Sequence, residues 1–429
     1  MTAKSVLTKG EGLFDTHVHL EDVQYVISKQ MESANPELLN NAKLSVVGDG
    51  NGFMSQVLLV NSSNTSFNPS KFIIKIASCL HFQQICEKFK SNGSIHQFTP
   101  EMEAAMMKNL ELHAQELHNR EVSFYEIVES WNAHEELLTP KLYFANKFDA
   151  VNQIKGFMGM EFVEDTEIRH LYENVKVEEL YPILKSLAFL QAKSLSMTPI
   201  ERESIGGFDF ERLTSQMLSE TGLKGILDAV RMLDEERLGE KVKKLEDLGM
   251  ELVNFELARN LNRNVSIEHD VLVHGDLWSA NILWKRNEGS YSAEKIIDYQ
   301  LIHFGNPAED LVRLFLTTLS GSDRRTHWEQ LLEVFYNFFI TCIGQNTIPY
   351  TLDQLKQSYR CYFVTGGLVV LPMFGPVAEI KMNQVGTDNA AITKSRQEVL
   401  LEKAECLLED IALFQRYNLL VPKSTSTTI

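Results

Sequence analysis

The chain has 429 residues, of which 44% are hydrophobic and 23% are charged, and its formal net charge is −17 at pH 7. This length favours two domains over one. The acidic balance without a basic stripe excludes the pattern of a nucleic-acid-binding protein, which concentrates Lys and Arg along the phosphate backbone.

Cysteine usage and hydropathy bear on where the protein works. The five cysteines are scattered and form no CxxC pair, so we expect reduced thiols rather than a zinc ribbon or disulfide framework. No run approaches the roughly 18 apolar residues of a membrane span, and the N-terminus lacks the apolar run of a signal peptide. We therefore expect a cytoplasmic protein without a membrane span; its oligomeric state is not indicated by any pattern.

The first third of the chain alternates β-rich runs with turns, which predicts a sheet-rich region containing one long helix. The expected strands are Leu44–Val47, Gln56–Val60, Phe72–Ile76, Leu142–Phe144 and Gly156–Val163. The expected helix begins at Pro100 and continues to about Glu129.

After Asp165 the apolar residues take helical spacing. The expected helices are Val177–Ala192, Phe210–Leu233, Gly239–Leu261, Glu309–Leu319, Trp328–Ile343, Tyr359–Leu371 and Gln397–Tyr417. Two short β-like runs, Ile282–Trp284 and Lys295–Ile297, interrupt them. We predict an α+β protein with two lobes: a sheet-rich domain over 1–163, a large helical domain over 164–422, and a polar tail over 423–429.

The segment VLVHGDLWSANILW, followed by KIIDYQ, contains the residue types that phosphoryl transfer requires. Asp276 and Asn281 lie five positions apart in a short loop between apolar runs, and Asp298 ends the next β-run. One carboxylate orients the attacking hydroxyl, while an amide oxygen and a second carboxylate hold Mg²⁺ on nucleotide phosphates. We assign Asp276 to the first role and Asn281 and Asp298 to the second. His274 either orients this loop through hydrogen bonds or is a structural histidine.

Two upstream segments fit the nucleotide that this chemistry needs. Gly48, Gly50 and Gly52 lie between two β-runs, where backbone N–H groups can close over phosphates, and Ser55 adds a hydroxyl. Lys75 lies inside the apolar strand FIIKI. A lysine there needs a counter-charge or a ligand, because burying an isolated ammonium is very costly.

A helix glutamate is the expected partner of Lys75. The helix that begins at Pro100 carries many acids, and we choose Glu121 because Phe124 lies near the same helical face. Glu116 and Glu126 remain open as alternatives.

Together these stretches resemble the choline-kinase-like kinases, also called CHK or ecdysteroid-kinase-like, and especially their nematode branch. The stretches GDGNGFMSQV, FIIKI, REVSFY, MGMEFVED, VLVHGDLWSANILW, IIDYQ and FGNPAEDLVRLF occur in the family's order. The resemblance implies a bilobal protein-kinase-like fold that binds ATP and Mg²⁺. It also implies that Asp276 is the catalytic base, that Lys75 binds phosphate, and that the backbone from Glu161 to Val163 reads adenine.

The resemblance further implies that Asp310 braces the catalytic loop, although a helix-starting acid is an equal alternative. Asp298-Tyr299-Gln300 stands where protein kinases have Asp-Phe-Gly, and no long activation segment fits before Glu309. These departures favour a small alcohol as the phosphate acceptor, and the resemblance implies a steroid-, choline- or glycoside-like one.

The acceptor pocket is expected between the helices from Ile205 to Leu261 and those near the C-terminus. Aromatic residues there either line the pocket or pack the helices: Tyr359, Tyr362, Phe363 and Phe374.

Two other functions compete with the kinase. A pseudokinase would hold nucleotide or a ligand without transferring phosphate, and the presence of the motif residues argues against it. A metallohydrolase would use Asp15, His17 and His19, whose i, i+2 spacing imitates a first-strand metal site. That enzyme needs a parallel βα repeat, which the helical second half does not supply.

Overall fold

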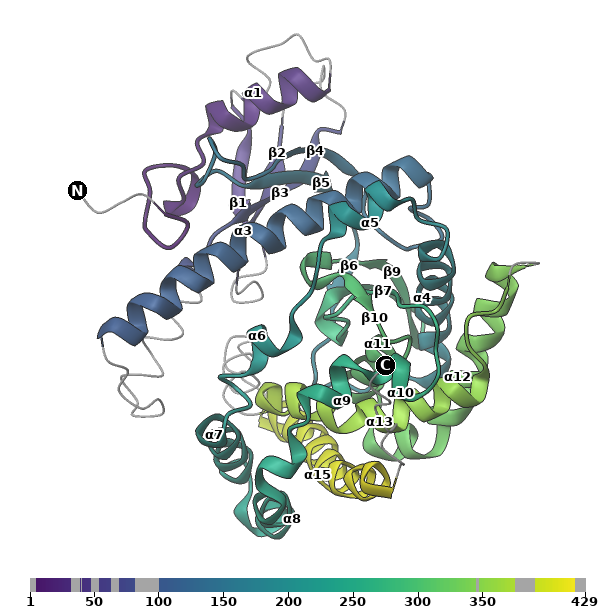
Figure 1. Cartoon of the computed structure of the whole chain (residues 1–429). Helices are drawn as coiled ribbons and strands as arrows, with labels where there is room; N and C mark the ends of the chain where they lie inside the picture. Colours follow the sequence, from purple (N-terminus) through teal and green to yellow (C-terminus); the bar gives the residue numbers. More distant parts are fainter. Residues whose placement is uncertain are drawn as a thin grey trace, which may run out of the picture. The chain divides into compact units, whose positions relative to one another are not determined.

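The computed structural model describes residues 5–31, 39, 41–47, 54–62, 69–81, 100–344, 347–374 and 390–420 (Figure 1). The chain divides into two compact units. The first contains Met1–Glu135, Thr139–Glu164 and Asp298–Leu301, and the second contains Glu136–Leu138, Asp165–Ile297 and Ile302–Ile429. The α+β class expected from the sequence is confirmed, because the first unit is rich in strands and the second is mostly helical.

The first unit is built on a five-stranded antiparallel sheet in the order β1-β2-β3-β5-β4. The strands are β1 (Lys43–Val46), β2 (Ser55–Asn61), β3 (Lys71–Ala77), β4 (Leu142–Asn146) and β5 (Phe157–Glu161). All five match strands expected from the sequence to within two residues at each end. In the middle strand, Lys75 lies opposite Val57 on one side and Met158 on the other, so its position is fixed by two ladders.

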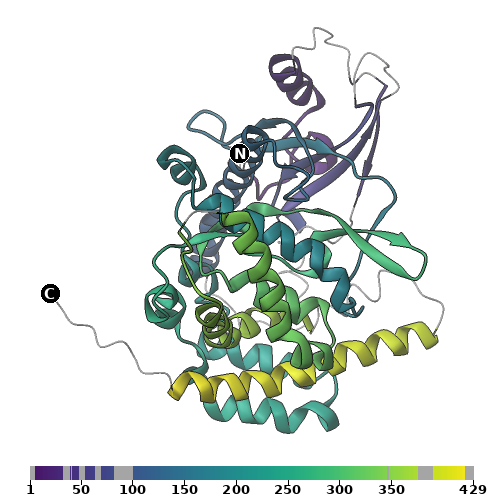
Figure 2. The same ribbon diagram turned by 90° about the vertical axis from the view of Figure 1, so that its right-hand side faces the viewer.

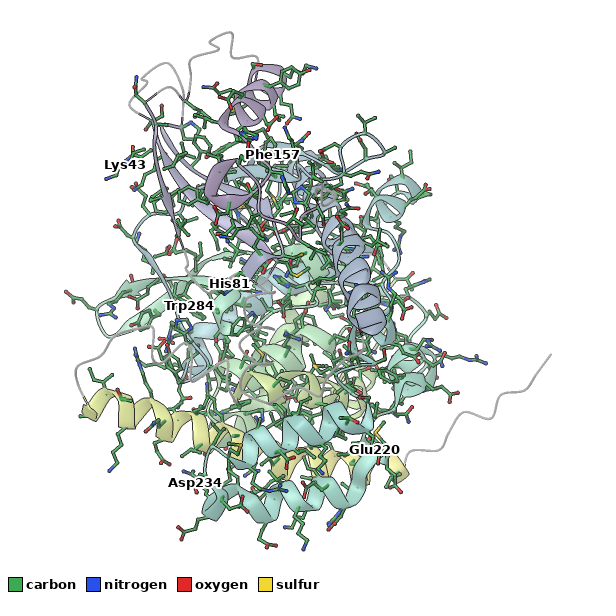
Figure 3. The ribbon with its side chains drawn as sticks, turned by 90° about the vertical axis from the view of Figure 1, so that its left-hand side faces the viewer. Lys43, His81, Phe157, Glu220, Asp234 and Trp284 are labelled. Carbon is green, nitrogen blue, oxygen red and sulfur yellow. The ribbon has the colours of Figure 1, made fainter. Side chains whose placement is uncertain are left out.

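Among the described residues, the helices α1 (Leu20–Gln30) and α3 (Pro100–Trp131) accompany this sheet. The apolar face of α1 packs with the sheet in one core, which contains Val23, Ile27, Phe72 and the Phe157 labelled in Figure 3. The sequence did not predict α1. Its start is defined by a local signal, since the Asp22 carboxylate accepts a hydrogen bond from the His19 N–H at 2.8 Å.

The second unit contains two small antiparallel sheets. One has the order β6-β8-β9, made of Thr166–Ile168, Ile282–Asn287 and Ser290–Ile296; the other pairs β7 (Val271–Val273) with β10 (His303–Gly305). The sequence predicted only the first half of β8, as Ile282–Trp284, and the end of β9, as Lys295–Ile297. Three-residue strands such as β6 and β10 are too short to show an alternating pattern, so only their pairing identifies them.

Helices form the rest of the second unit, and the long α15 is the yellow helix of Figure 2. The helices are η2 (Val177–Leu180), α4 (Tyr181–Ser194), α5 (Pro199–Ile205), α6 (Phe210–Thr214), α7 (Glu220–Arg231), α8 (Glu235–Leu248), η3 (Gly249–Leu252), α9 (Phe255–Arg259), α10 (Leu261–Asn264), α11 (Glu309–Thr318), α12 (Gly321–Ile343), α13 (Leu352–Val370), η6 (Leu371–Phe374) and α15 (Ala390–Leu420). Within the described residues, no helix is both long enough and apolar enough to cross a bilayer.

Capping residues correct two of the expected helices. The run Phe210–Leu233 is not one helix, because the Ser219 hydroxyl accepts from Gly222 N–H at 3.1 Å and starts α7 as a separate helix. The run Gly239–Leu261 is likewise divided, since Gly249 adopts a φ of 53° and ends α8. An apolar period continues through such breaks, so periodicity alone does not detect them.

Candidate active site

Lys75 is the centre of a buried charge cluster in the first unit. Its ammonium donates to both carboxylate oxygens of Glu121, at 2.8 and 2.7 Å, and to Asp298 Oδ1 at 2.6 Å. The Lys75 side chain is only 12% exposed and that of Glu121 only 2%. Three residues far apart in the sequence, from β3, α3 and the segment after β9, are therefore held at one point.

The structure selects Glu121 from the three candidate glutamates. Glu126 lies on a more exposed face of α3 and pairs with Lys147 at 2.6 Å. Glu121 projects to the sheet because α3 presents that face to β3, a relation between elements that the helix sequence does not contain.

The electrostatics of the cluster follow from its unequal charges. Burial alone would lower the pKa of Lys75, but the carboxylates of Asp298 and Glu121 outweigh it and raise the pKa above its ordinary value. Burial raises the pKa of Glu121 to about 7; Lys75 opposes this rise and Asp298 adds to it. One ammonium thus faces two carboxylates, and the cluster carries an excess negative charge when all three groups are ionised.

Asp298 is positioned by the residue that follows it. Its backbone takes a left-handed φ of 68°, after which the chain forms the short 3₁₀ helix η5 (Tyr299–Leu301). The buried Tyr299 ring stacks on Phe124 of α3 at 4.3 Å between centroids and contacts Tyr125 edge-on at 5.8 Å. These ring contacts hold the segment against the helix that carries Glu121.

The structure describes Ser55, Glu161 and Val163 among the other residues predicted to bind nucleotide in the first unit. Ser55 begins β2 and pairs with Ala77 of β3, next to the pair formed by Gln56 and Ile76. Glu161 ends β5, and its backbone N–H donates to the Lys141 carbonyl at 2.9 Å. Val163 follows it. Gly48, Gly50 and Gly52 lie outside the described residues. Binding of phosphate and adenine by these residues stays a prediction.

In the second unit, β7 leads directly into the predicted catalytic loop. His274 at its end is fully buried, and its ring contacts Ile297 O at 3.0 Å through Nε2 and Asp276 N at 3.2 Å through Nδ1. Since Nδ1 accepts from the backbone N–H, Nε2 carries the proton and donates to the carbonyl. His274 therefore ties the loop to the end of β9 through hydrogen bonds.

Asp310, in the first turn of α11, holds the same loop from the opposite direction. Its carboxylate accepts from His274 N at 2.7 Å and Gly275 N at 2.9 Å. Burial raises the pKa of this side chain to about 6, against the opposing effect of the two backbone donors. Gly275 has a φ of 80°, so the tight turn between these two bonds needs a glycine.

Asp276 and Asn281 close the loop on each other. The Asn281 amide donates to the Asp276 carbonyl at 2.9 Å and to its carboxylate Oδ2 at 3.3 Å. The other carboxylate oxygen, Oδ1, forms a salt bridge with Arg313 of α11. The sequence analysis quoted the stretch that contains Arg313 without assigning it a role, and its position one helical turn after Asp310 was the available signal.

The donor set fits the divalent cation predicted from the sequence. Amide and carboxylate oxygens such as those of Asn281 and Asp298 are ligands that Mg²⁺ accepts, and Mg²⁺ usually takes one or two protein groups together with substrate phosphates. No group of three or more His, Cys, Asp and Glu side chains that could hold a metal ion occurs among the residues the structure describes.

The contacts of Asp15, His17 and His19 bear on the metallohydrolase alternative. Asp15 pairs with Lys9 at 2.8 Å, His17 contacts the Thr8 hydroxyl at 3.0 Å, and His19 precedes α1 as its N-cap. Within the described residues these three side chains do not gather into a metal-binding group, so the structure gives the metallohydrolase alternative no support.

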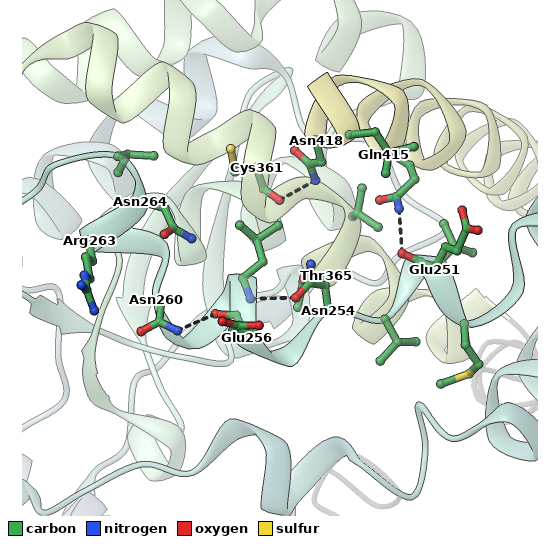
Figure 4. A pocket seen from close by; sticks show the side chains of 17 residues that line it. Glu251, Asn254, Glu256, Asn260, Arg263, Asn264, Cys361, Thr365, Gln415 and Asn418 are labelled. Carbon is green, nitrogen blue, oxygen red and sulfur yellow. Dashed lines mark hydrogen bonds between the residues drawn. The ribbon is translucent and has the colours of Figure 1, made fainter. Parts of the chain in front are cut away.

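The region expected to bind the acceptor contains two cavities. One, of about 580 Å³ and shown in Figure 4, is lined by η3, α9, α10, α13 and α15 and is rich in side-chain amides, including Asn254, Gln415 and Asn418. The other, of about 540 Å³, is lined by Phe208, Phe255, Phe304, Glu309 and Tyr362 among others. Of the four aromatic residues singled out from the sequence, Tyr359, Phe363 and Phe374 line neither cavity and are buried.

Comparison with known proteins places the chain among nematode relatives. It is 25% identical over 355 residues to "Uncharacterized oxidoreductase dhs-27" of Caenorhabditis elegans, covering 80% of this chain and 41% of that protein. It is 30% identical over 155 residues to "Uncharacterized kinase-like protein D1044.1" of the same organism, covering 36% of this chain and 34% of that protein. The chain therefore spans less than half the length of either relative. The second agrees with the nematode kinase-like resemblance found in the motifs.

A solved structure of choline kinase from Cryptosporidium parvum is similar over 92% of this chain and 99% of its own, with 13% identity and a TM-score of 0.46. At that level of likeness, the chemistry of this chain rests on its own residues. A family model described as "DUF1679: Uncharacterized oxidoreductase dhs-27" matches residues 6–419, nearly the whole sequence. The chain belongs to this family.

Proposed function

We propose that this protein is a small-molecule kinase that transfers the γ-phosphate of Mg·ATP to a hydroxyl group of a small alcohol. The observation that carries the proposal is the buried Lys75, held at once by Glu121 and Asp298. An ion pair alone would be a costly way to stabilise a core, because desolvating the charges offsets much of their attraction. A fixed ammonium next to two carboxylates is instead suited to organising a phosphate and its counter-cation.

The charge balance of the cluster supports a nucleotide with a divalent cation as its ligand. Two carboxylates and one ammonium leave excess negative charge when all three groups are ionised. When bound, Mg²⁺ neutralises charge on the nucleotide phosphates, and Asp298 with Asn281 would hold it. Lys75 would then bind phosphate oxygens while Glu121 keeps its ammonium in place.

The catalytic loop supplies the groups that the acceptor needs. Asp276 would accept a hydrogen bond from the acceptor hydroxyl and point its oxygen at the γ-phosphorus. The loop is rigidly held for this task, because Asp310 binds two of its backbone N–H groups and His274 ties it to Ile297. Pre-organisation of this kind is what a reaction with little covalent participation by the enzyme requires.

The relatives support kinase chemistry without naming the acceptor. One nematode relative is called kinase-like, and the similar solved structure is a choline kinase. The word oxidoreductase belongs to a longer protein of which this chain spans 41%. The sequence resemblance extends the acceptor class to steroid-, choline- or glycoside-like alcohols.

The test is transfer of labelled phosphate. The purified protein is incubated with γ-labelled ATP, Mg²⁺ and a small-metabolite extract, and phosphorylated products are identified by mass spectrometry. We expect a labelled product that disappears in Asp276→Asn and in Asp298→Ala, while circular dichroism and melting temperature show that both variants remain folded. ATP binding without any product would favour the pseudokinase. Undiminished turnover in either variant would refute the mechanism.

A further inference from the structure

Helix α11 directs two charged side chains to the catalytic loop. Asp310 and Arg313 are three residues apart, which places them on the same face of the helix. Asp310 accepts hydrogen bonds from the backbone of His274 and Gly275, whereas Arg313 forms a salt bridge with the side chain of Asp276. Asp310 thus fixes the backbone of the loop, and Arg313 contacts the Asp276 carboxylate, which is proposed to bind the acceptor hydroxyl.

The Asp276 carboxylate is held from two directions. Its Oδ1 bonds the Arg313 guanidinium and its Oδ2 receives the Asn281 amide at 3.3 Å. The side chains of Asp276 and Arg313 are only 16% and 17% exposed, so water screens their attraction weakly. The carboxylate is therefore fixed in rotation as well as in position.

A purely stabilising role does not account for the rest of the guanidinium. Arg313 Nε is buried and has no hydrogen-bond partner in the described part of the chain. A buried donor without a partner costs stability, and structural arginines are normally satisfied at most of their donors. The cost is understandable where a site is arranged for function rather than for stability.

The surroundings of Arg313 strengthen this interpretation. Tyr362 of α13 is half-buried, and desolvation followed by the charge of Glu309 raises its pKa well above the ordinary value, while Arg313 acts in the opposite direction. Tyr362 and Glu309 also line the aromatic cavity of about 540 Å³. Arg313 thus pairs with Asp276 and also acts electrostatically on Tyr362, a residue of a cavity wall in the same unit.

We infer that Arg313 is a positioning residue for phosphoryl transfer, which holds the Asp276 carboxylate correctly rotated toward the acceptor hydroxyl. This inference rests on the proposed kinase function. The carboxylate orients the hydroxyl without keeping its proton. The acceptor oxygen bonds to the γ-phosphorus, the bond from that phosphorus to the bridging oxygen of ADP breaks, and the hydroxyl proton ends on the transferred phosphoryl group.

The experiment uses water as the acceptor, so that the natural alcohol need not be known. Steady-state hydrolysis of Mg·ATP is measured for wild type, Arg313→Gln, Arg313→Lys and Asp276→Asn. Loss of one charge-assisted contact predicts a fall in kcat of about 10- to 100-fold in Arg313→Gln. The KM for ATP should change by less than about threefold, because Lys75 and its partners are untouched. Arg313→Lys should recover part of kcat.

Two further variants separate positioning from simple stability. Arg231→Gln removes a similarly exposed arginine from its salt bridges with Asp228 and Glu246 on α7 and α8, and we expect wild-type kcat from it. In the double variant Asp276→Asn/Arg313→Gln, kcat should equal that of Asp276→Asn alone, because Arg313 acts only through Asp276.

Failure of the inference and failure of the function look different. If Arg313→Gln hydrolyses ATP like wild type while Asp276→Asn does not, Arg313 has no positioning role and the kinase function stands. The inference would also be overturned if Arg313→Gln lowered both kcat and the melting temperature and Arg313→Lys restored neither. A wild type without turnover would remove the proposed function and the role of Arg313 together.

Discussion

The burial of Glu121 beside Lys75 leads to a quantitative prediction for Glu121→Gln. This substitution keeps the shape of the side chain and removes its charge. In the folded protein the pKa of Glu121 is about 7, raised from 4.5 mainly by burial, with Lys75 opposing and Asp298 adding to the shift. The side chain is 2% exposed, so solvent does not weaken the effect.

The sign of the pH effect follows from the direction of this shift. Between pH 4.5 and 7 the folded state keeps a proton on Glu121 that the unfolded chain releases. The stability that this proton provides is complete below the unfolded pKa and is lost as pH rises through the folded pKa. Over an interval from about pH 5 to about pH 8, the loss amounts to about 2 to 3 kcal/mol. Glutamine does not titrate, so the variant should gain this amount relative to wild type.

The assay is urea unfolding of both proteins, in the absence of nucleotide, at several pH values. Because a protein of two units need not unfold in one step, unfolding is followed by pulsed hydrogen exchange in peptides from β3 and α3. ATP turnover is measured in parallel and should fall in Glu121→Gln, since Lys75 loses a partner. We thus expect a variant that is more stable at high pH and less active.

Two outcomes would refute this reasoning. A stability difference between the two proteins that does not change with pH would mean that the surroundings of Glu121 do not raise its pKa. A difference that decreases as pH rises would mean that Lys75 dominates as a simple ion-pair partner. Glu126→Gln, on the same helix but paired with Lys147, is the control; an equal pH dependence there would show that the effect is not specific to the cluster.

Two substitutions test the packing of the first unit, and a third tests the helix α7 of the second unit. Tyr299→Ala removes a buried ring stacked on Phe124; the melting temperature should drop with a loss of about 3 to 5 kcal/mol, KM for ATP should rise, and Tyr299→Phe should restore both. In Gly159→Ala the new Cβ would lie 2.1 Å from the Phe144 ring, so urea unfolding should show a loss of about 1 to 3 kcal/mol. Gly225 lies inside α7, and a Cβ added there would have no atom within 4 Å. Gly225→Ala should therefore raise the free energy of unfolding by about 0.5 to 1 kcal/mol. A lower free energy of unfolding would contradict a helical conformation at this position.

The first unit shows how far local patterns extend. The five strands were predicted because β-branched and apolar runs between turn residues identify strands directly. The helix α1 was missed, because its apolar face becomes recognisable only when it is packed on the sheet with Phe72 and Phe157. In the second unit, β10 was missed for the same reason: its three residues gain their conformation from pairing with β7.

The candidate site divides along the same line. The spacing of Asp276, Asn281 and Asp298 and the presence of a lysine inside an apolar strand predicted the class of chemistry from sequence alone, because these residue types fulfil a fixed chemical requirement. Only the tertiary structure decided which glutamate meets Lys75 and that Arg313 meets Asp276. Those pairings join residues 46 and 37 positions apart, and their geometry depends on how α3 and α11 are rotated against their neighbours, a relation set by packing rather than by any local pattern in the chain.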